Sequence, residues 1–253
     1  MEARSVAALQ AMKRNGEKIV GIVAWDVQIA RIVDRAGVDI VSVGDTVGVN
    51  VWGRDNPLDV TMDEMVLVCR AVRRGVERAL VSCDFPYGPL QAGPGEAVRA
   101  ARRLVEEGGA DLVKLDGAAD FSEAVAAVAA TGIPVFAQFG ETPQTGERSQ
   151  PAEALVAQAC LLEQAGASLL DFTHSGAVAG PQVVAAVSIP VLGGLGGGPW
   201  LDGRMRMIHR GIGYAASYLD DPPDAYANVA RITYDAITAY ADDVRSDRQI
   251  RGA

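Results

Sequence analysis

A strand-like apolar run followed by a helix-like run recurs along the chain, and this alternation constrains the fold more than any other feature. Residues 18–25 form the first apolar run, and residues 29–36 follow with apolar side chains at helical spacing before Gly37. A short helix between two such runs returns the chain to the same sheet edge, which predicts parallel βαβ units. Eight alternating units within 253 residues predict an α/β protein with a (β/α)8 TIM barrel fold.

The expected strands end near residues 25, 45, 84, 116, 139, 171 and 192, and a weaker eighth candidate lies near residues 212–216. A long amphipathic helix is expected over about residues 225–244. An open doubly wound sheet is the alternative, but no GxGxxG motif follows the first strand. We therefore expect one barrel domain over residues 1–253, with a short N-terminal helix and a frayed tail from about residue 245.

The chain is acidic, with a formal net charge of −9 and a pI near 4.8. Nucleic acids and anionic membranes need a basic surface, so neither is an expected partner. No apolar run follows the first charged residues, and Gly132 and Pro134 interrupt the longest uncharged segment, residues 124–140. The three cysteines are widely spaced without a CxxC motif, which favours buried thiols over disulfides or a zinc site. We expect a cytoplasmic protein that acts on a small molecule.

Acidic or amide side chains stand at six of the expected strand ends. They are Asp26, Asp45, Asp84, Asp116, Gln138 and Asp171. Because the carboxyl ends of barrel strands meet at one face, we expect these side chains to ring one mouth. Like charges gathered in a buried cleft need a proton or a divalent cation, which predicts a hard-metal site. For any single aspartate, capping of the following helix is the alternative.

Six short motifs are spread along the chain: Gly44-Asp45-Thr46, Arg73-Arg74-Gly75, Asp84-Phe85-Pro86, Lys114-Leu115-Asp116-Gly117, Thr142-Pro143-Gln144 and Asp202-Gly203. In this order they resemble the ketopantoate hydroxymethyltransferase family. The resemblance implies a barrel of the phosphoenolpyruvate/pyruvate-binding superfamily type that depends on Mg²⁺ or another divalent cation. It also implies a homo-oligomer.

The resemblance further implies transfer of a hydroxymethyl group from 5,10-methylenetetrahydrofolate to C3 of a 2-oxo acid through an enolate. A cation at the keto oxygen would stabilise the enolate charge as a Lewis acid. The implied metal ligands are Asp45, Asp84 and Asp116. The implied substrate-binding residues are Asp45, Thr46, Asp84, Lys114 and Gln138. Lys114 lies two residues before Asp116 and so shares its face of the strand, where an ion pair with an aspartate is a second, compatible role.

The implied catalytic base is Asp171, which stands where the family has a longer glutamate. Asp116 likewise replaces a glutamate, Gln138 replaces a histidine, and the segment after Gln144 is shorter than in the family. These departures predict an altered 2-oxo acid or electrophile. His174, three residues beyond Asp171, is a second catalytic candidate, although a loop histidine is often a bystander.

Alternatives to hydroxymethyl transfer stay open at this point. A carbon–carbon lyase, aldolase or mutase of the same superfamily would act on a 2-oxo acid without folate, and a catalytically silent paralogue would do neither. Residues 193–198 are a weak candidate for a phosphate-binding loop. Trp25 and Trp200 could stack on a pterin, with simple packing as the alternative.

Overall fold

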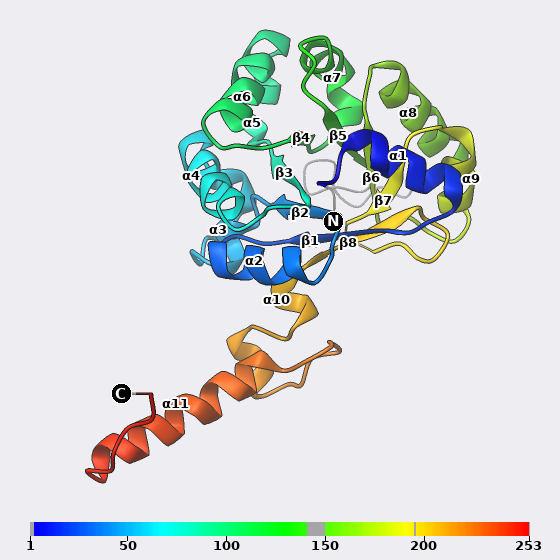
Figure 1. The fold of residues 1–253 in the computed structure, drawn as a ribbon. Helices are drawn as coiled ribbons and strands as arrows, with labels where there is room; N and C mark the ends of the chain where they lie inside the picture. Colours follow the sequence, from blue (N-terminus) through cyan, green and yellow to red (C-terminus); the bar gives the residue numbers. More distant parts are fainter. Residues whose placement is uncertain (1–2, 141–149, 195, 253) are drawn as a thin grey trace. The chain divides into compact units, whose positions relative to one another are not determined.

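Eight parallel strands close into a barrel in chain order, as Figure 1 shows. The computed structural model describes residues 3–140, 150–194 and 196–252. The strands are β1 (Ile19–Val23), β2 (Ile40–Val43), β3 (Leu80–Asp84), β4 (Leu112–Leu115), β5 (Val135–Gly140), β6 (Leu169–Thr173), β7 (Val191–Gly193) and β8 (Gly203–Met207). The predicted TIM barrel is therefore confirmed, and the open sheet is excluded.

One helix precedes β1, and the others follow the first six strands around the barrel (Figure 1). They are α1 (Val6–Asn15), α2 (Val27–Arg35), α3 (Val47–Asn50), α4 (Met62–Arg73), α5 (Tyr87–Gln91), α6 (Pro94–Glu106), α7 (Ser122–Ala129), α8 (Ala152–Gln164) and α9 (Ala179–Ala186), with 3₁₀ turns η1 (Pro57–Asp59) and η2 (Ala118–Phe121). Side-chain capping by polar residues fixes where two of these helices begin. Thr61 and Glu64 form a reciprocal capping box at α4, and the Ser5 hydroxyl accepts from the Ala8 N–H at α1.

The half of the barrel at the amino-terminal ends of the strands is filled with apolar side chains. Those from the strands are Ile19, Ile40, Leu80, Leu112, Phe136, Leu169, Leu192 and Met205, and Leu9 and Met12 of α1 join the same cluster. A Cβ on Gly21 would lie 1.9 Å from the Met205 sulfur, so the Met205 side chain would have to move to admit any larger residue there. Full burial of each large side chain contributes roughly 1.5–3 kcal/mol, so this cluster is a major source of stability. The amino end of the barrel is thus core, and the opposite end is left for polar groups.

The eighth strand was expected near residues 212–216, and this prediction was wrong. The strand is β8, and it pairs with β7 through Leu192↔Gly203 and Gly193↔Arg204. Its sequence, GRMRM, places Met205 inward while Arg204 and Arg206 are exposed. The two arginines hide the apolar pattern that marks the other strands, because only one face of β8 is buried.

The chain divides into two compact units, Met1–Met205 and Arg206–Ala253. The second contains α10 (Ile208–Gly211), η3 (Ala216–Leu219) and α11 (Val229–Arg245), and α11 lies close to the helix expected over residues 225–244. The assignment of the whole chain to one domain stays a prediction.

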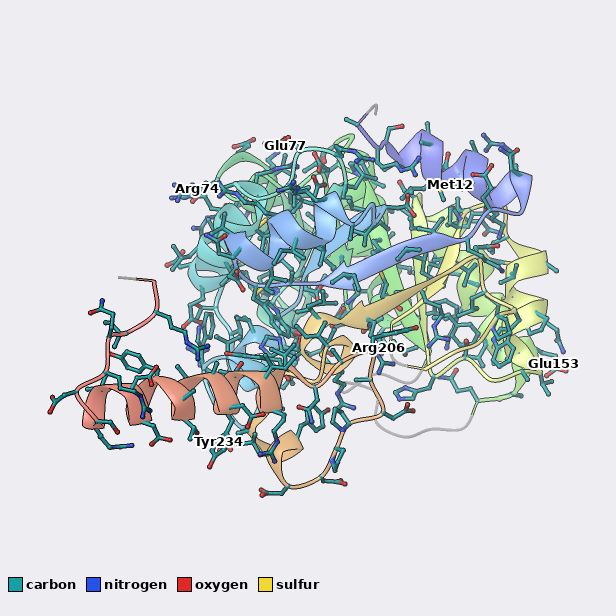
Figure 2. All side chains as sticks on the ribbon, turned by 60° about the horizontal axis from the view of Figure 1, so that its bottom comes forward. Met12, Arg74, Glu77, Glu153, Arg206 and Tyr234 are labelled. Atoms are coloured by element: carbon teal, nitrogen blue, oxygen red, sulfur yellow. The ribbon has the colours of Figure 1, made fainter. Side chains whose placement is uncertain are left out.

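Helix α11 buries none of its residues. Its exposed apolar side chains include Ile232, Ile237 and Tyr234, the last of which is labelled in Figure 2. Within the described ranges, no helix is long and apolar enough to cross a membrane.

Candidate active site

The predicted cation site lies where β2, β3 and β4 end. Asp45, Asp84 and Asp116 each offer a carboxylate oxygen, and these oxygens lie within 4.8 Å of one another. All three residues are buried, with 6% of each exposed. The site forms because β2 pairs with β3 and β3 with β4 in parallel, which brings the three strand ends side by side.

The electrostatics of this cluster fit a divalent cation. Burial, followed by the charges of Asp116 and Asp84, raises the pKa of Asp45 well above its usual value. Burial raises the pKa of Asp84 to about 7, although Lys114 acts in the opposite direction. The Asp84 Oδ1 atom is buried and accepts no hydrogen bond from any described residue. An oxygen-lined cluster with an orphaned acceptor and unfavourable charge suits a hard ion such as Mg²⁺.

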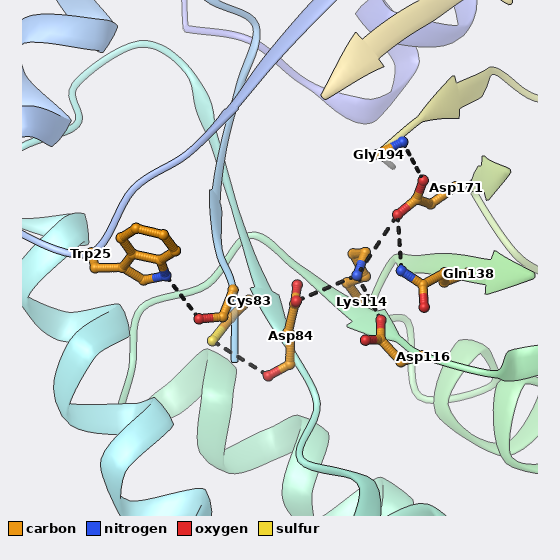
Figure 3. Close-up of polar contacts among 9 residues, drawn as sticks. Trp25, Cys83, Asp84, Lys114, Asp116, Gln138, Asp171 and Gly194 are labelled. Atoms are coloured by element: carbon orange, nitrogen blue, oxygen red, sulfur yellow. Dashed lines mark hydrogen bonds and ion pairs between the residues drawn. The ribbon is translucent and has the colours of Figure 1, made fainter. Parts of the chain in front are cut away.

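Lys114 connects this cluster to the other side of the mouth, as Figure 3 shows. Its Nζ atom lies 2.6 Å from Asp116 Oδ1, 3.3 Å from Asp84 Oδ2 and 3.7 Å from Asp171 Oδ2. Burial alone would lower the pKa of Lys114, but the surrounding carboxylates raise it well above its usual value. The ion-pair role expected from the sequence is therefore confirmed, and the ammonium group stays charged.

Asp171 lies on β6 opposite Gln138 of β5 and is almost fully buried. Its Oδ1 accepts from the Gly194 N–H at 2.8 Å, and its Oδ2 accepts from the Gln138 Nε2 at 3.2 Å. Burial raises the pKa of Asp171, and Lys114 only partly offsets this effect. A carboxylate held in place with a raised pKa can act as a general base near neutral pH.

Sequence reasoning missed Gly194. A Cβ at this position would lie 2.9 Å from both carboxylate oxygens of Asp171, so a side chain would displace this carboxylate. The run of glycines was the available signal, but it suggested a phosphate loop. The observed contacts of this loop go to the protein instead, since Gly194 donates to Asp171 and the Gly197 carbonyl accepts from Arg204. Phosphate binding stays a prediction.

Other expected site residues have structural roles. Asp26 caps α2, where its Oδ1 accepts from the backbone of Gln28 and Ile29, so the capping alternative holds for this residue. Trp25 is buried and donates to the Gly44 carbonyl at 2.9 Å. Trp200 donates to Ser175 Oγ at 3.3 Å and packs closely on glycines. These contacts favour the packing alternative for both tryptophans.

Three further expectations concern the rim of the mouth. Thr46 directly follows Asp45, and its backbone N–H lowers the pKa of that carboxylate. His174 is exposed just beyond β6 with a φ of 52°, a conformation that costs a non-glycine residue energy. The motif at residues 142–144 and the shortened segment after it lie outside the described residues. The roles of Thr46 and His174 stay predictions.

The buried thiols expected from the sequence are present in part. Cys69 and Cys83 are buried, Cys160 is half-buried, and all three are free. Burial raises the pKa of the Cys83 thiol well above its usual value. Cys83 is therefore a protonated core residue, although it precedes Asp84.

The fold and the site together define a (β/α)8 barrel with a metal-compatible carboxylate cluster and a candidate base at its carboxyl face. A family model described as ketopantoate hydroxymethyltransferase matches residues 3–249. The chain belongs to the ketopantoate hydroxymethyltransferase family. The family and the transferase class expected from the sequence are confirmed.

Two curated relatives illustrate this kinship. The 3-methyl-2-oxobutanoate hydroxymethyltransferase of Cyanothece sp. is 36% identical over 255 residues, which cover 96% of each chain. The enzyme of the same name from Geobacter sulfurreducens is 34% identical and covers 96% of this chain and 94% of its own.

Two solved structures share the fold at lower identity. The 2,3-dimethylmalate lyase of the PEP mutase/isocitrate lyase superfamily has a TM-score of 0.63 at 16% identity and covers 99% of this chain and 90% of its own. Oxaloacetate acetylhydrolase has a TM-score of 0.65 at 15% identity, and the match covers 100% of this chain and 90% of its own. At this identity the likeness shows the barrel fold alone.

Proposed function

We propose that this protein transfers a hydroxymethyl group to C3 of a 2-oxo acid, with 3-methyl-2-oxobutanoate, the acid in its relatives' name, as the first candidate. The observation that carries the proposal is the placement of the acidic cluster, Lys114 and Asp171 in one mouth. In this assignment, Asp45, Asp84 and Asp116 hold a divalent cation such as Mg²⁺. The cation supplies Lewis-acid polarisation of the keto group.

The side chains of the mouth supply the rest of the chemistry. Lys114 remains charged and binds the carboxylate of the 2-oxo acid, assisted by Thr46. Asp171 removes the C3 proton, and the Gly194 N–H and the Gln138 amide hold its carboxylate in a fixed position. The donor that we propose is 5,10-methylenetetrahydrofolate, whose one-carbon unit is hydrolysed by one water to formaldehyde with release of tetrahydrofolate. The enolate carbon attacks the formaldehyde carbon, and the resulting alkoxide takes up a proton to become the hydroxyl of the new hydroxymethyl group.

Deuterium exchange at C3 across a panel of 2-oxo acids tests this function. We expect exchange in the wild type that depends on a divalent cation, and loss of exchange in Asp45→Asn and Asp84→Asn. Asp26→Asn is the matched control, since this strand-end aspartate only caps a helix and should exchange normally. Exchange at the wild-type rate in both Asp45→Asn and Asp84→Asn would refute the assignment of these aspartates to a cation site. Cleavage of the acid without folate would favour the lyase alternative, and absence of both reactions would indicate a silent paralogue.

We also propose that the protein forms a homo-oligomer, with a second copy of the chain covering α11. Ile232 is 63% exposed and Ile237 is 62% exposed, and Tyr240 and Val244 are exposed on the same helix. An apolar helix surface of this kind is normally buried against a partner. Light scattering that gives a mass near 26.5 kDa would contradict this proposal. The expected small-molecule substrate agrees with the family to which the chain belongs. A cytoplasmic location stays a prediction.

A further inference from the structure

The side-chain oxygen of Gln138 is a buried acceptor that the proposed chemistry does not yet use. Gln138 is 5% exposed, and its Nε2 atom donates to Asp171 Oδ2. Its Oε1 atom is buried and receives no hydrogen bond within the described part of the chain. The amide orientation follows from chemistry, because an ionised carboxylate only accepts and must face the NH₂ group. Figure 3 shows the oxygen on the side of the amide away from Asp171.

Gln138 lies inside the barrel rather than against its outer helices. Phe136, two residues earlier on β5, belongs to the apolar cluster that fills the barrel, and alternate residues of a strand share one face. Leu169 and Asp171 have the same relation on β6. A buried acceptor is rarely left unsatisfied, so this oxygen is placed for a donor that enters the mouth.

The 2-oxo acid and the hydroxymethylated product differ in whether they contain a hydrogen-bond donor for this oxygen. A simple 2-oxo acid has a carboxylate and a keto oxygen, which only accept hydrogen bonds. The product has one new donor, the hydroxyl of the added hydroxymethyl group. That group is attached to C3, the carbon from which Asp171 removes the proton. The Gln138 oxygen lies about 2.2 Å from its own Nε2 by amide geometry, and Nε2 contacts Asp171, so a C3 substituent is within its reach.

We propose that Gln138 Oε1 accepts a hydrogen bond from the hydroxyl of the newly added hydroxymethyl group. Gln138 is therefore a specificity-determining residue that distinguishes the hydroxylated acid from the 2-oxo acid. The inference rests on the proposed function. Because the donor exists only once the new carbon–carbon bond forms, Gln138 stabilises the product and the late part of the reaction, and the KM for the 2-oxo acid does not depend on it.

Two ligands that differ by one hydroxyl test the proposal. They are 4-hydroxy-3,3-dimethyl-2-oxobutanoate and 3,3-dimethyl-2-oxobutanoate, and neither has a C3 proton for Asp171 to remove. Their dissociation constants are measured by calorimetry at saturating Mg²⁺, with no folate present. We expect the wild type to bind the hydroxylated acid about tenfold or more tightly, since an unpaired buried acceptor disfavours the other ligand. Gln138→Met should reduce this preference to within about twofold, because only the binding of the hydroxylated acid becomes weaker.

Gln158→Met is the matched control. Gln158 on α8 also donates through Nε2, to Gln150 Oε1 at 2.8 Å, and its own Oε1 is likewise buried without a partner among the described residues. This variant should keep the wild-type preference. Gln138→Asn keeps the amide but withdraws it by one methylene group, about 1.5 Å, and replaces Gln138→Met if the latter does not fold.

The possible results distinguish failure of the proposed function from failure of the role proposed for Gln138. A wild type that binds neither acid in the presence of Mg²⁺ refutes the proposed function and this inference with it. A wild type that binds both acids equally refutes the inference alone. A preference that survives in Gln138→Met, or in Gln138→Asn where that variant is used, also overturns it. Loss of the preference in the Gln138 variant but not in Gln158→Met supports it.

Discussion

Replacing Asp84 with asparagine is expected to stabilise the cation-free protein at pH 8. Burial raises the pKa of Asp84 to about 7, against 3.8 for an ordinary aspartate. At about 1.36 kcal/mol per pKa unit, this difference means that ionised Asp84 costs the folded state about 4 kcal/mol. Asparagine removes that cost but loses the contact with Lys114, so we expect a net gain of about 2–4 kcal/mol in the free energy of unfolding.

The sign of the pH dependence follows from proton binding. Between about pH 4 and pH 7 the folded protein keeps a proton on Asp84 that the unfolded chain has lost, so wild-type stability falls as the pH rises through this window. Below about pH 4 both states are protonated and the cost is absent. The gain from Asp84→Asn should therefore be smaller at pH 5 than at pH 8.

Urea denaturation of the chelator-treated protein at both pH values measures this gain. Asp26→Asn is the control and should leave stability nearly unchanged, because asparagine caps a helix about as well as aspartate. Added Mg²⁺ should stabilise the wild type in proportion to its binding and should stabilise Asp84→Asn much less. A cation-free Asp84→Asn variant that is less stable than the wild type at pH 8, or equally stabilised at both pH values, would refute the reasoning.

Four further predictions concern other parts of the molecule. Asp171→Asn should lose C3 exchange, measured by NMR, while still binding the 2-oxo acid and the cation; exchange at the wild-type rate would make His174 the next candidate base. Asp171→Glu should lower activity on 3-methyl-2-oxobutanoate, because its longer side chain no longer fits the Gly194 and Gln138 contacts; activity equal to that of the wild type would show that these contacts do not position the carboxylate. Ile237→Glu in α11 should lower the mass found by light scattering, since it places a charge on the exposed apolar surface, and an unchanged mass would argue against α11 as the contact. Thr61→Ala should lower the free energy of unfolding by about 1 kcal/mol through loss of the capping box, and denaturation curves that superimpose on the wild type would contradict this.

The sequence by itself determined the barrel and most of its mouth. Its alternating strands and helices have the period and length that parallel βαβ units require, and polar residues such as Asp45, Asp84 and Asp171 stand at or near the carboxyl ends of the strands. Since the topology brings all carboxyl ends of the strands together, these residues could be grouped without coordinates. The same reasoning failed for β8, because Arg204 and Arg206 hide its single buried face.

Tertiary structure alone decided what each polar residue does. Asp26 and Asp45 both follow a strand, yet the first caps a helix and the second joins the acidic cluster, because their neighbours in space differ. The contact between Gly194 and Asp171 joins residues 23 positions apart, and that between Gln138 and Asp171 joins residues 33 positions apart. Local spacing contains no information about such pairs. They exist only because the closed barrel fixes the register between β5, β6 and β7, and that register places a donor on each oxygen of the proposed base.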